Sequence, residues 1–247
     1  MQIPKVIHYC WFGGNQLPKL AEKCIESWRK YCPDYEIVQW NESNFDLNSC
    51  DYVRQAYAEK KYAFVSDYAR LKILYDNGGV YLDTDVELLK RLPDKILENG
   101  YLAKETDCLI ATGLGFACKK GDDFIGDLLK KYESEQFVKL QKSSGDFNYK
   151  TCVEQMSELL EENNITIDIN TENIFGIPVY PDEFFCGFDV TNNCYNITEN
   201  TISVHHYSGS WVDNKHKLKN KIKRLISRII GKNGYSKLRQ IKRYIKR

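Results

Sequence analysis

The sequence of 247 residues predicts an α/β fold, with a mixed, mainly parallel central sheet flanked by helices. Three observations predict it. Strand-like apolar runs alternate with segments whose apolar residues recur at helical spacing. Two of the strand-like runs are followed at once by residues suited to binding a ligand, which is where ligands bind in such sheets. The length is enough for one domain with a sizeable core.

The first quarter of the chain predicts two strands and two helices. Residues 3–12 form a strand-like run that stops at Gly13-Gly14. Pro18 then opens a helix, with Leu20, Cys24, Ile25 and Trp28 on one face. Residues 35–40 predict a second strand, and a short helix follows over about 51–60.

The segment 62–89 predicts a helix, a turn and two short strands. The helix covers about 62–76 and buries a stripe of aromatic and aliphatic residues. Gly78-Gly79 ends it as a left-handed cap would. Residues 80–82 then form an apolar strand, and 86–89 are expected to pair as another.

The second half of the chain is less regular. An apolar stretch with glycines covers 108–118, and helices are expected at 122–133 and 152–162. Residues 165–169 and 201–205 predict two late strands.

Asp83 and Asp85 lie one residue apart, directly after the apolar strand 80–82. Carboxylates so close together repel each other unless a cation lies between them. Hard divalent ions prefer oxygen ligands and commonly also hold phosphates. The doublet therefore predicts a metal–diphosphate site; the alternative is a solvated turn with a capping aspartate.

Asp67 and Arg70 lie three residues apart, on one helix face and off the apolar stripe. They can form a plain ion pair worth a few tenths of a kcal/mol. Alternatively they line the cleft, where the planar guanidinium suits a phosphate or a sugar diol.

A donor-rich segment, 204–211, contains two adjacent histidines. His205 and His206 point to opposite sides of a strand, so only one can join the carboxylates as a metal ligand. Ser210 and the Trp211 indole N–H are donors that could meet a phosphate. Near the N-terminus, Trp11 either stacks on a base or belongs to the core.

The charge of the chain is strongly divided. Residues 215–247 hold 14 of the 35 Lys/Arg and no Asp/Glu, which leaves 1–214 with 21 basic and 34 acidic residues. Apolar residues of the tail recur at helical spacing, from Leu218 to Ile229 and again from Leu238 to Ile245. A basic amphipathic helix of this kind predicts binding to an anionic membrane surface. The alternatives are packing on the acidic body, disorder or, less favoured, nucleic acid.

Composition suggests where the protein works. The nine cysteines lack the CxxC pairing of a zinc site and the density of a disulfide scaffold, which favours reduced thiols in the cytoplasm. We expect no signal peptide before the strand-like run at 3–12. No apolar stretch approaches the roughly 20 residues of a membrane span.

Four segments, taken together, resemble the family 32 glycosyltransferases, whose sugar-binding region contains a DXD motif. They read IPKVIHYCWFGG, FVSDYARLKILYDNGGVYLDTDVELL, IATGLGFACKKGDDF and HHYSGSW, and they extend from residue 3 to 211. The resemblance extends distantly to the glucosyltransferase domains of large clostridial toxins. It implies a GT-A (Rossmann-like) fold, a nucleotide-sugar donor, Mn²⁺ or Mg²⁺, and transfer with retention of anomeric configuration.

The resemblance also implies roles on the nucleotide side. Trp11 would stack on the base, and Ser66, Asp67 and Arg70 would contact the ribose and the donor sugar. Tyr81 would lie beside the nucleotide.

On the diphosphate side, Asp83 would hold the ribose and the metal, and Asp85 would ligate the metal. His206 occupies the ligand place in the HYSG pattern, while Ser210 and Trp211 would hold the diphosphate. With Asp67 and Arg70, the two aspartates form the expected catalytic set.

One departure concerns the acceptor side. Many members have Thr-Gly-Pro near the middle, where this chain has the segment 148–152, Asn-Tyr-Lys-Thr-Cys. The acceptor side and the sugar pocket therefore do not carry over. No catalytic base stands out; Glu154 and Gln155 begin a helix there and are guesses.

These patterns predict a catalytic domain over 1–214 and a basic helical tail over 215–247. The expected enzyme is bacterial and lies at the inner face of the plasma membrane. It moves a hexose from UDP-galactose or UDP-glucose, rather than GDP-mannose, to a glycan or lipid-linked glycan. Capsule, exopolysaccharide or lipopolysaccharide synthesis would be its pathway. The alternatives are a toxin-like enzyme that glycosylates a protein, and a non-catalytic membrane adaptor with a structural cation.

Overall fold

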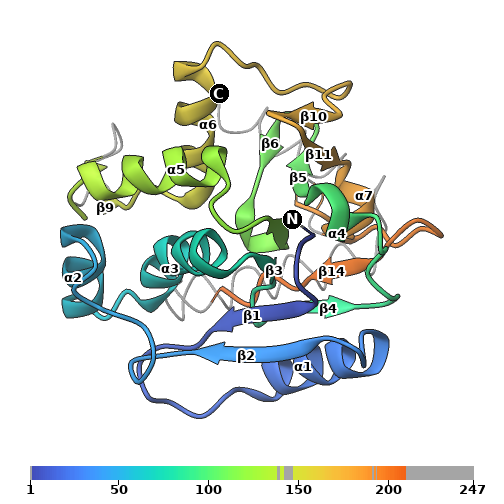
Figure 1. Cartoon of the computed structure of the whole chain (residues 1–247), viewed down its shortest axis with the longest axis horizontal. Coiled ribbons are helices and arrows are strands. Elements are labelled where there is room, and N and C mark those ends of the chain that lie inside the picture. The colour runs from blue at the N-terminus through green and yellow to red at the C-terminus, as the bar shows by residue number, and fades with distance from the viewer. Residues whose placement is uncertain (1, 138–139, 142–146, 191, 193, 210–247) are drawn as a thin grey trace, which may run out of the picture.

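The protein is described from a computed structural model, which covers residues 2–137, 140–141, 147–190, 192 and 194–209. It has the predicted α/β fold, in which helices flank a mixed central sheet (Figure 1). The predicted tail, 215–247, lies outside the described residues.

The central sheet has the strand order β2-β1-β3-β7. Its strands are β1 (Val6–Cys10), β2 (Glu36–Trp40), β3 (Gly79–Tyr81) and β7 (Phe116–Cys118). β1 pairs in parallel with both β2 and β3, whereas β7 runs antiparallel to β3. The sheet is therefore mixed and mainly parallel, as the sequence predicts.

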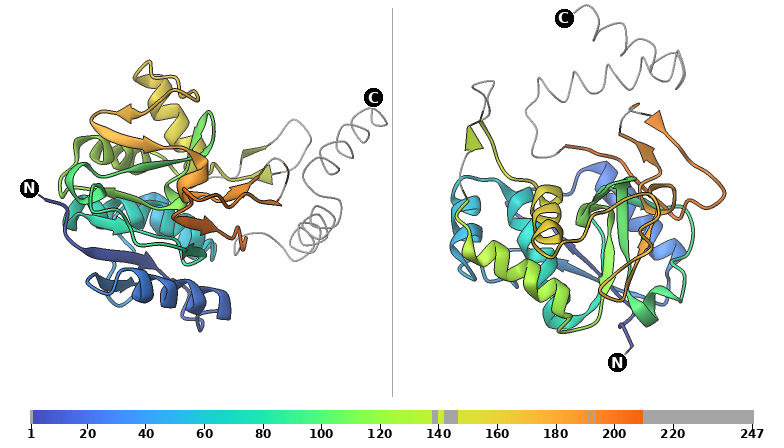
Figure 2. Two further views of the ribbon diagram at one scale, coloured as in Figure 1. Left: turned by 90° about the vertical axis from the view of Figure 1, so that its right-hand side faces the viewer. Right: turned by 90° about the horizontal axis from the view of Figure 1, so that it is seen from above.

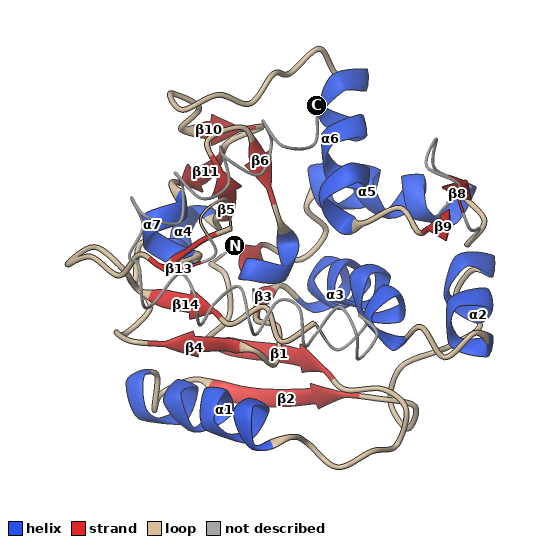
Figure 3. Cartoon of the chain, turned by 180° about the vertical axis from the view of Figure 1, so that it is seen from behind, coloured by secondary structure: helices blue, strands red, loops and turns tan. Residues whose placement is uncertain are grey.

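Side-chain alternation along these strands divides the core in two. Ile7, Tyr9 and Val80 pack into one cluster with α1 (Lys19–Tyr31). Cys10 and Tyr81 pack into the other with α2 (Asp51–Ala58), α3 (Tyr62–Asn77), α5 (Asp123–Ser134) and α6 (Cys152–Glu162). Because successive side chains of a strand point to opposite faces, one sheet can support helices on both sides. Figures 2 and 3 show α1 beside β2 and the group α3, α5 and α6 across β1 from it.

The helices match the sequence closely. They are α1 (Lys19–Tyr31), α2 (Asp51–Ala58), α3 (Tyr62–Asn77), α4 (Ile96–Asn99), α5 (Asp123–Ser134), α6 (Cys152–Glu162) and α7 (Asp182–Phe185), with a 3₁₀ turn, η1 (Thr112–Leu114). The two short ones, α4 and α7, were not predicted.

The turn between α3 and β3 requires its glycines. Gly78 and Gly79 have φ values of +71° and +109°, which L side chains rarely adopt. A Cβ on Gly79 would also come within 2.9 Å of the Val6 carbonyl oxygen. The pair therefore lets the chain leave a long helix and enter the centre of the sheet at once.

A second sheet, of order β10-β11-β5-β6, lies beyond β7. Its strands are β5 (Leu102–Thr106), β6 (Leu109–Ile110), β10 (Asn173–Ile174) and β11 (Ile177–Tyr180). Three antiparallel pairs complete the structure: β4 (Val86–Leu88) with β14 (Ser203–His205), β12 (Phe188–Asp189) with β13 (Cys194–Tyr195), and β8 (Leu140–Gln141) with β9 (Phe147–Asn148).

The predicted strand at 165–169 is wrong. Residues Asp168 and Thr171 bond each other in a local turn, and Lys104 Nζ donates to the carbonyl oxygens of Asp168 and Ile169. Because the side-chain ammonium takes these carbonyls, they are not in a strand ladder. The nearby strands are instead β10 and β11.

All nine cysteines are free thiols. Within the described residues, no helix combines the length and the apolar character that a membrane crossing requires.

Candidate active site

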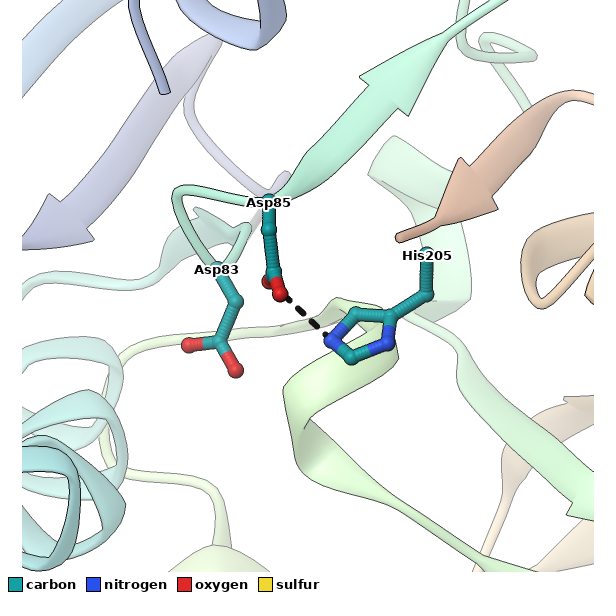
Figure 4. A group of neighbouring side chains, drawn as sticks. All are labelled: Asp83, Asp85 and His205. Carbon is teal, nitrogen blue, oxygen red and sulfur yellow. Dashed lines mark ion pairs between the residues drawn. The ribbon is translucent and has the colours of Figure 1, made fainter. Parts of the chain in front are cut away.

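Three side chains from two distant parts of the chain meet beyond the end of β3. Asp83 and Asp85 lie in the turn that joins β3 to β4, and β14 runs antiparallel to β4 with His205 opposite Val86. Figure 4 shows the His205 imidazole directed at the Asp85 carboxylate, with Asp83 beside them. The β4–β14 pairing therefore completes the predicted doublet with a residue 120 positions further on.

Both carboxylate oxygens of Asp85 have a partner. Its Oδ1 lies 3.1 Å from His205 Nε2, and its Oδ2 accepts a hydrogen bond of 2.8 Å from the Ser208 N–H. Burial would raise the pKa of Asp85, but His205 and Ser208 outweigh it and hold the pKa below its usual value. The carboxylate is therefore ionised at neutral pH.

The donor set fits a divalent cation. Asp83, Asp85 and His205 each offer a ligand atom, and these atoms lie within 4.8 Å of one another. The nitrogen of His205 that faces the carboxylates is Nε2, which lies 3.1 Å from Asp85 Oδ1. Two carboxylates and an imidazole are ligands that Mn²⁺ accepts.

Arg70 links Asp67 to the doublet. Its Nη2 lies 3.0 Å from Asp67 Oδ1 and 2.9 Å from Asp83 Oδ1, and its Nη1 donates to Thr112 Oγ1. Both Arg70 and Asp67 are buried, with only 3% and 8% of their surface exposed. The i,i+3 pair left open by the sequence does form, and it also belongs to the site.

Burial alters the charge balance of this cluster. It raises the pKa of Asp67 to about 6, against the opposing effect of Arg70, and Asp83 adds to the rise. Burial likewise raises the pKa of Asp83, although Arg70 opposes it. Arg70 is therefore shared between two carboxylates, both of which have lost much of their hydration. Its Nε is buried and has no partner within the described chain.

Tyr81 hydrogen-bonds Asp83 from the buried side of the site. It is 1% exposed, its hydroxyl donates to Asp83 Oδ1 at 2.9 Å, and the Arg70 guanidinium lies 5.1 Å from its ring centre. Tyr81 and Asp83 lie two residues apart and so share a face of the chain.

Thr112 and Gly113, which the sequence did not single out, close the site from η1. A Cβ on Gly113 would lie 2.8 Å from Asp83 Oδ2 and 3.5 Å from Arg70 Nη1. Only glycine leaves the carboxylate its present position. The signal for this contact was the glycine-bearing apolar stretch at 108–118.

Trp11 and Ser66 lie on neighbouring elements. The Trp11 indole N–H donates to the Asn15 carbonyl at 2.7 Å, and the ring is only partly buried. The turn after Trp11 contacts the start of α3, because a Cβ on Gly13 would lie 2.4 Å from the Tyr62 ring. Ser66 stands one helical turn further on and bonds the Tyr62 carbonyl.

The His206 side chain bonds other residues than the Asp83 and Asp85 carboxylates, contrary to the ligand role that the resemblance implied. Its two ring nitrogens bond Tyr195 and Glu87, each at 2.8 Å. His205 takes the place beside Asp85 because it faces the opposite side of the strand. Ser210 and Trp211 lie outside the described residues.

The two guesses for a base have other partners. Glu154 forms a capping box with Thr151 at the start of α6, and the fully buried Gln155 donates to Glu135. Neither bonds a member of the Asp83–Asp85–His205 cluster.

Comparison with known proteins bears out the resemblance seen in the sequence. Residues 18–103, which contain Asp67, Arg70, Asp83 and Asp85, match the family described as "Glycosyltransferase sugar-binding region containing DXD motif". The resemblance to this family is confirmed for that region of the chain.

Two curated proteins are similar to parts of the chain. Inositol phosphoceramide mannosyltransferase 3 of Schizosaccharomyces pombe is 31% identical over 128 residues, which are 50% of this chain and 35% of the relative. Subversion of eukaryotic traffic protein A of Legionella pneumophila is 29% identical over 122 residues, which are 38% of this chain and 19% of the relative. The matched region thus spans well under half of either protein.

Among solved structures, the chain is similar to one titled "PaToxG Glycosyltransferase", with a TM-score of 0.48 and 18% identity. The match covers 66% of this chain and 70% of the other. A likeness this distant supports no conclusion about function.

Proposed function

We propose that this chain, which carries the DXD-containing sugar-binding region of a glycosyltransferase family, is a metal-dependent, retaining hexosyltransferase that uses a nucleotide sugar. One observation carries the proposal. The strand-end doublet meets His205 and the buried Arg70. Asp83, Asp85 and His205 offer ligand atoms within 4.8 Å of one another, and Arg70 Nη2 lies 2.9 Å from Asp83 Oδ1.

Asp83, Asp85 and His205 would hold Mn²⁺ or Mg²⁺. Bound there, the ion would act as a Lewis acid that offsets the negative charge of the nucleoside diphosphate leaving group. Asp85 suits this role because its carboxylate stays ionised, while Tyr81 and Arg70 fix the orientation of Asp83.

Arg70 would act on the donor through its positive charge, with the guanidinium already fixed by Asp67, Asp83 and Thr112. A charge that is oriented before the substrate arrives costs no reorganisation during the reaction. Asp67 keeps the guanidinium in place and would accept a hydrogen bond from a sugar hydroxyl.

The base of the nucleotide would stack on Trp11, with Ser66 at the ribose, because the two residues lie on adjoining elements. Ser210 and Trp211 would donate to the diphosphate. Retention of configuration rests on the family resemblance.

For the donor we favour UDP-galactose or UDP-glucose. The alternative is GDP-mannose, since one relative is named a mannosyltransferase. The proposed acceptor is a glycan or lipid-linked glycan at the cytoplasmic face of a bacterial plasma membrane, in capsule, exopolysaccharide or lipopolysaccharide synthesis. The basic tail, 215–247, motivates this location.

Donor hydrolysis in the presence of Mn²⁺ tests the proposal. The full chain should release sugar from a UDP-hexose faster than background, and Asp85→Asn should lower the rate at least about 100-fold. Asp76→Asn is the matched control, because it removes an exposed carboxylate that pairs with Lys72, away from the Asp83–Asp85–His205 cluster. Equal rates for Asp85→Asn and the wild type would contradict the proposal, and a rate no faster than background would favour the adaptor.

A thermal-shift series over UDP- and GDP-sugars, with and without Mn²⁺, identifies the donor. We expect the largest rise in Tm with one UDP-hexose, and only when Mn²⁺ is present. A GDP-mannose response would assign the mannosyl alternative. Transfer to a protein, rather than to a lipid-linked glycan, would assign the toxin-like alternative.

A further inference from the structure

The side chain of His206, the residue after the candidate ligand His205, is hydrogen-bonded at both ring nitrogens. Its Nε2 lies 2.8 Å from Glu87 Oε2, and its Nδ1 lies 2.8 Å from the Tyr195 hydroxyl. Glu87 also forms an ion pair with Lys23, whose Nζ lies 2.8 Å from Glu87 Oε1. Both ring nitrogens of His206 are therefore occupied by protein, which leaves no lone pair for a metal.

These contacts join the two strands that carry the ligands. β14 pairs with β4 with Val204 opposite Glu87 and His205 opposite Val86. Beyond the last strand pair, the His206 N–H donates to the Asp85 carbonyl oxygen at 2.9 Å. His206 thus bonds the Asp85 backbone through its main chain and Glu87, two residues further on, through its side chain.

Tyr195 adds a third element. It lies on β13, and its ring meets the His206 ring edge-on at 5.8 Å between centroids. The imidazole is therefore fixed from the β12–β13 hairpin as well as from β4. It is 15% exposed, so most of its surface is packed against protein.

We propose that His206, Glu87 and Tyr195 form a clamp that fixes the separation of His205 and Asp85 and so determines how tightly the site binds its divalent ion. The inference rests on the proposed function, because that function requires the ion. His206 is then a positioning residue, which acts on the metal through the backbone it shares with His205.

The physical reason is preorganisation. β4 and β14 are short, with three residues each, and the ligands lie at or past their ends, where the ladder no longer constrains the backbone. Side-chain bonds beyond the ladder replace that constraint. Loss of such supporting partners typically weakens metal binding 10–100-fold.

Mn²⁺ titration of the full chain, followed by the EPR signal of the free ion, tests the clamp without measuring catalysis. Glu87→Gln and Tyr195→Phe preserve the shape of the side chain, and His206→Ala removes the imidazole at the centre of the clamp. We expect each to raise the Kd for Mn²⁺ roughly 10-fold. The double variant His206→Ala/Glu87→Gln should be little weaker than His206→Ala, because both changes break one unit.

Two controls complete the series. His205→Ala should abolish Mn²⁺ binding. Glu183→Gln removes the carboxylate that bonds Thr198 and Asn200 in the chain before β14, away from the ligands, and should leave the Kd unchanged. Circular dichroism and Tm confirm that each variant is folded at the titration temperature.

Two results would overturn the inference. The first is a wild-type Kd in all three clamp variants, even with a lower Tm, which would make the contacts purely structural. The second is loss of binding in His206→Ala alone, with Glu87→Gln and Tyr195→Phe unaffected, which would make His206 a ligand. If the wild type binds Mn²⁺ but no nucleotide sugar, the proposed function fails and the clamp stands. If it binds no Mn²⁺, both fail.

Discussion

Burial changes the pKa of individual side chains, and His8 is the clearest case outside the candidate site. It is 4% exposed, and burial lowers its pKa to about 4. The Trp40 indole donates to its Nδ1, so Nε2 carries the proton and donates to the Gly78 carbonyl. A second proton would break the bond to Trp40 as well as charge a buried ring.

His8 should therefore make the protein sensitive to acid. Its pKa is lower in the folded state than the ordinary 6.5, so its contribution to stability is fully present above pH 6.5 and is lost as the pH falls through about 4. The expected loss of unfolding free energy is of order 3 kcal/mol. Urea unfolding of wild type and His8→Gln from pH 7 to pH 4 measures it. Parallel pH profiles for the two proteins would contradict this.

At the scale of elements, helix caps show what short sequence signals contribute. Asp122 caps α5 by accepting a hydrogen bond from the Ile125 N–H at 3.2 Å. The neighbouring Asp123 lies in the first turn but does not cap it. Asp122 and Asp123 are the same residue type and both lie at the N-terminus of α5, yet only Asp122 caps the helix.

Asp122→Ala should lower the unfolding free energy by about 1 kcal/mol, because it leaves an N–H of the first turn unpaired. Asp123→Ala, the matched control, should cost only a few tenths through the helix dipole. Chemical denaturation separates the two. Equal costs would show that the cap bond contributes nothing, and donor hydrolysis should be unchanged in both.

Unlike these caps, the register of short strands cannot be inferred from a local sequence signal. β4 and β14 have three residues each, and no periodic signal that short can give their register. Their pairing nevertheless decides which residues join the doublet, because a shift by one residue would turn every side chain to the other face.

For the whole molecule, the dominant property is the division of charge between residues 1–214 and 215–247. All 34 acidic residues lie in the first part and 14 of the 35 basic residues in the second. Each Lys or Arg near an anionic leaflet contributes about 1 kcal/mol, so we expect the tail to bind such a surface despite the negative charge of residues 1–214.

Flotation with liposomes tests this division. Full-length protein should float with phosphatidylserine vesicles and remain below with neutral ones, whereas a 1–214 variant should float with neither. Raising the salt concentration should release the full-length protein, because exposed charges are screened. Equal partitioning of both proteins would remove the membrane from the proposal.

The sequence by itself determined the α/β class, most of the longer helices and strands, and the strand-end position of Asp83 and Asp85. These depend on periodicity and on neighbours within one turn or strand, which local physics decides. Only the tertiary structure decided that His205 rather than His206 faces Asp85, and that Gly113 closes against Asp83. Alternation along a strand states that two adjacent side chains diverge, but which one faces the site depends on a partner strand about 120 residues away, and no local pattern contains that register.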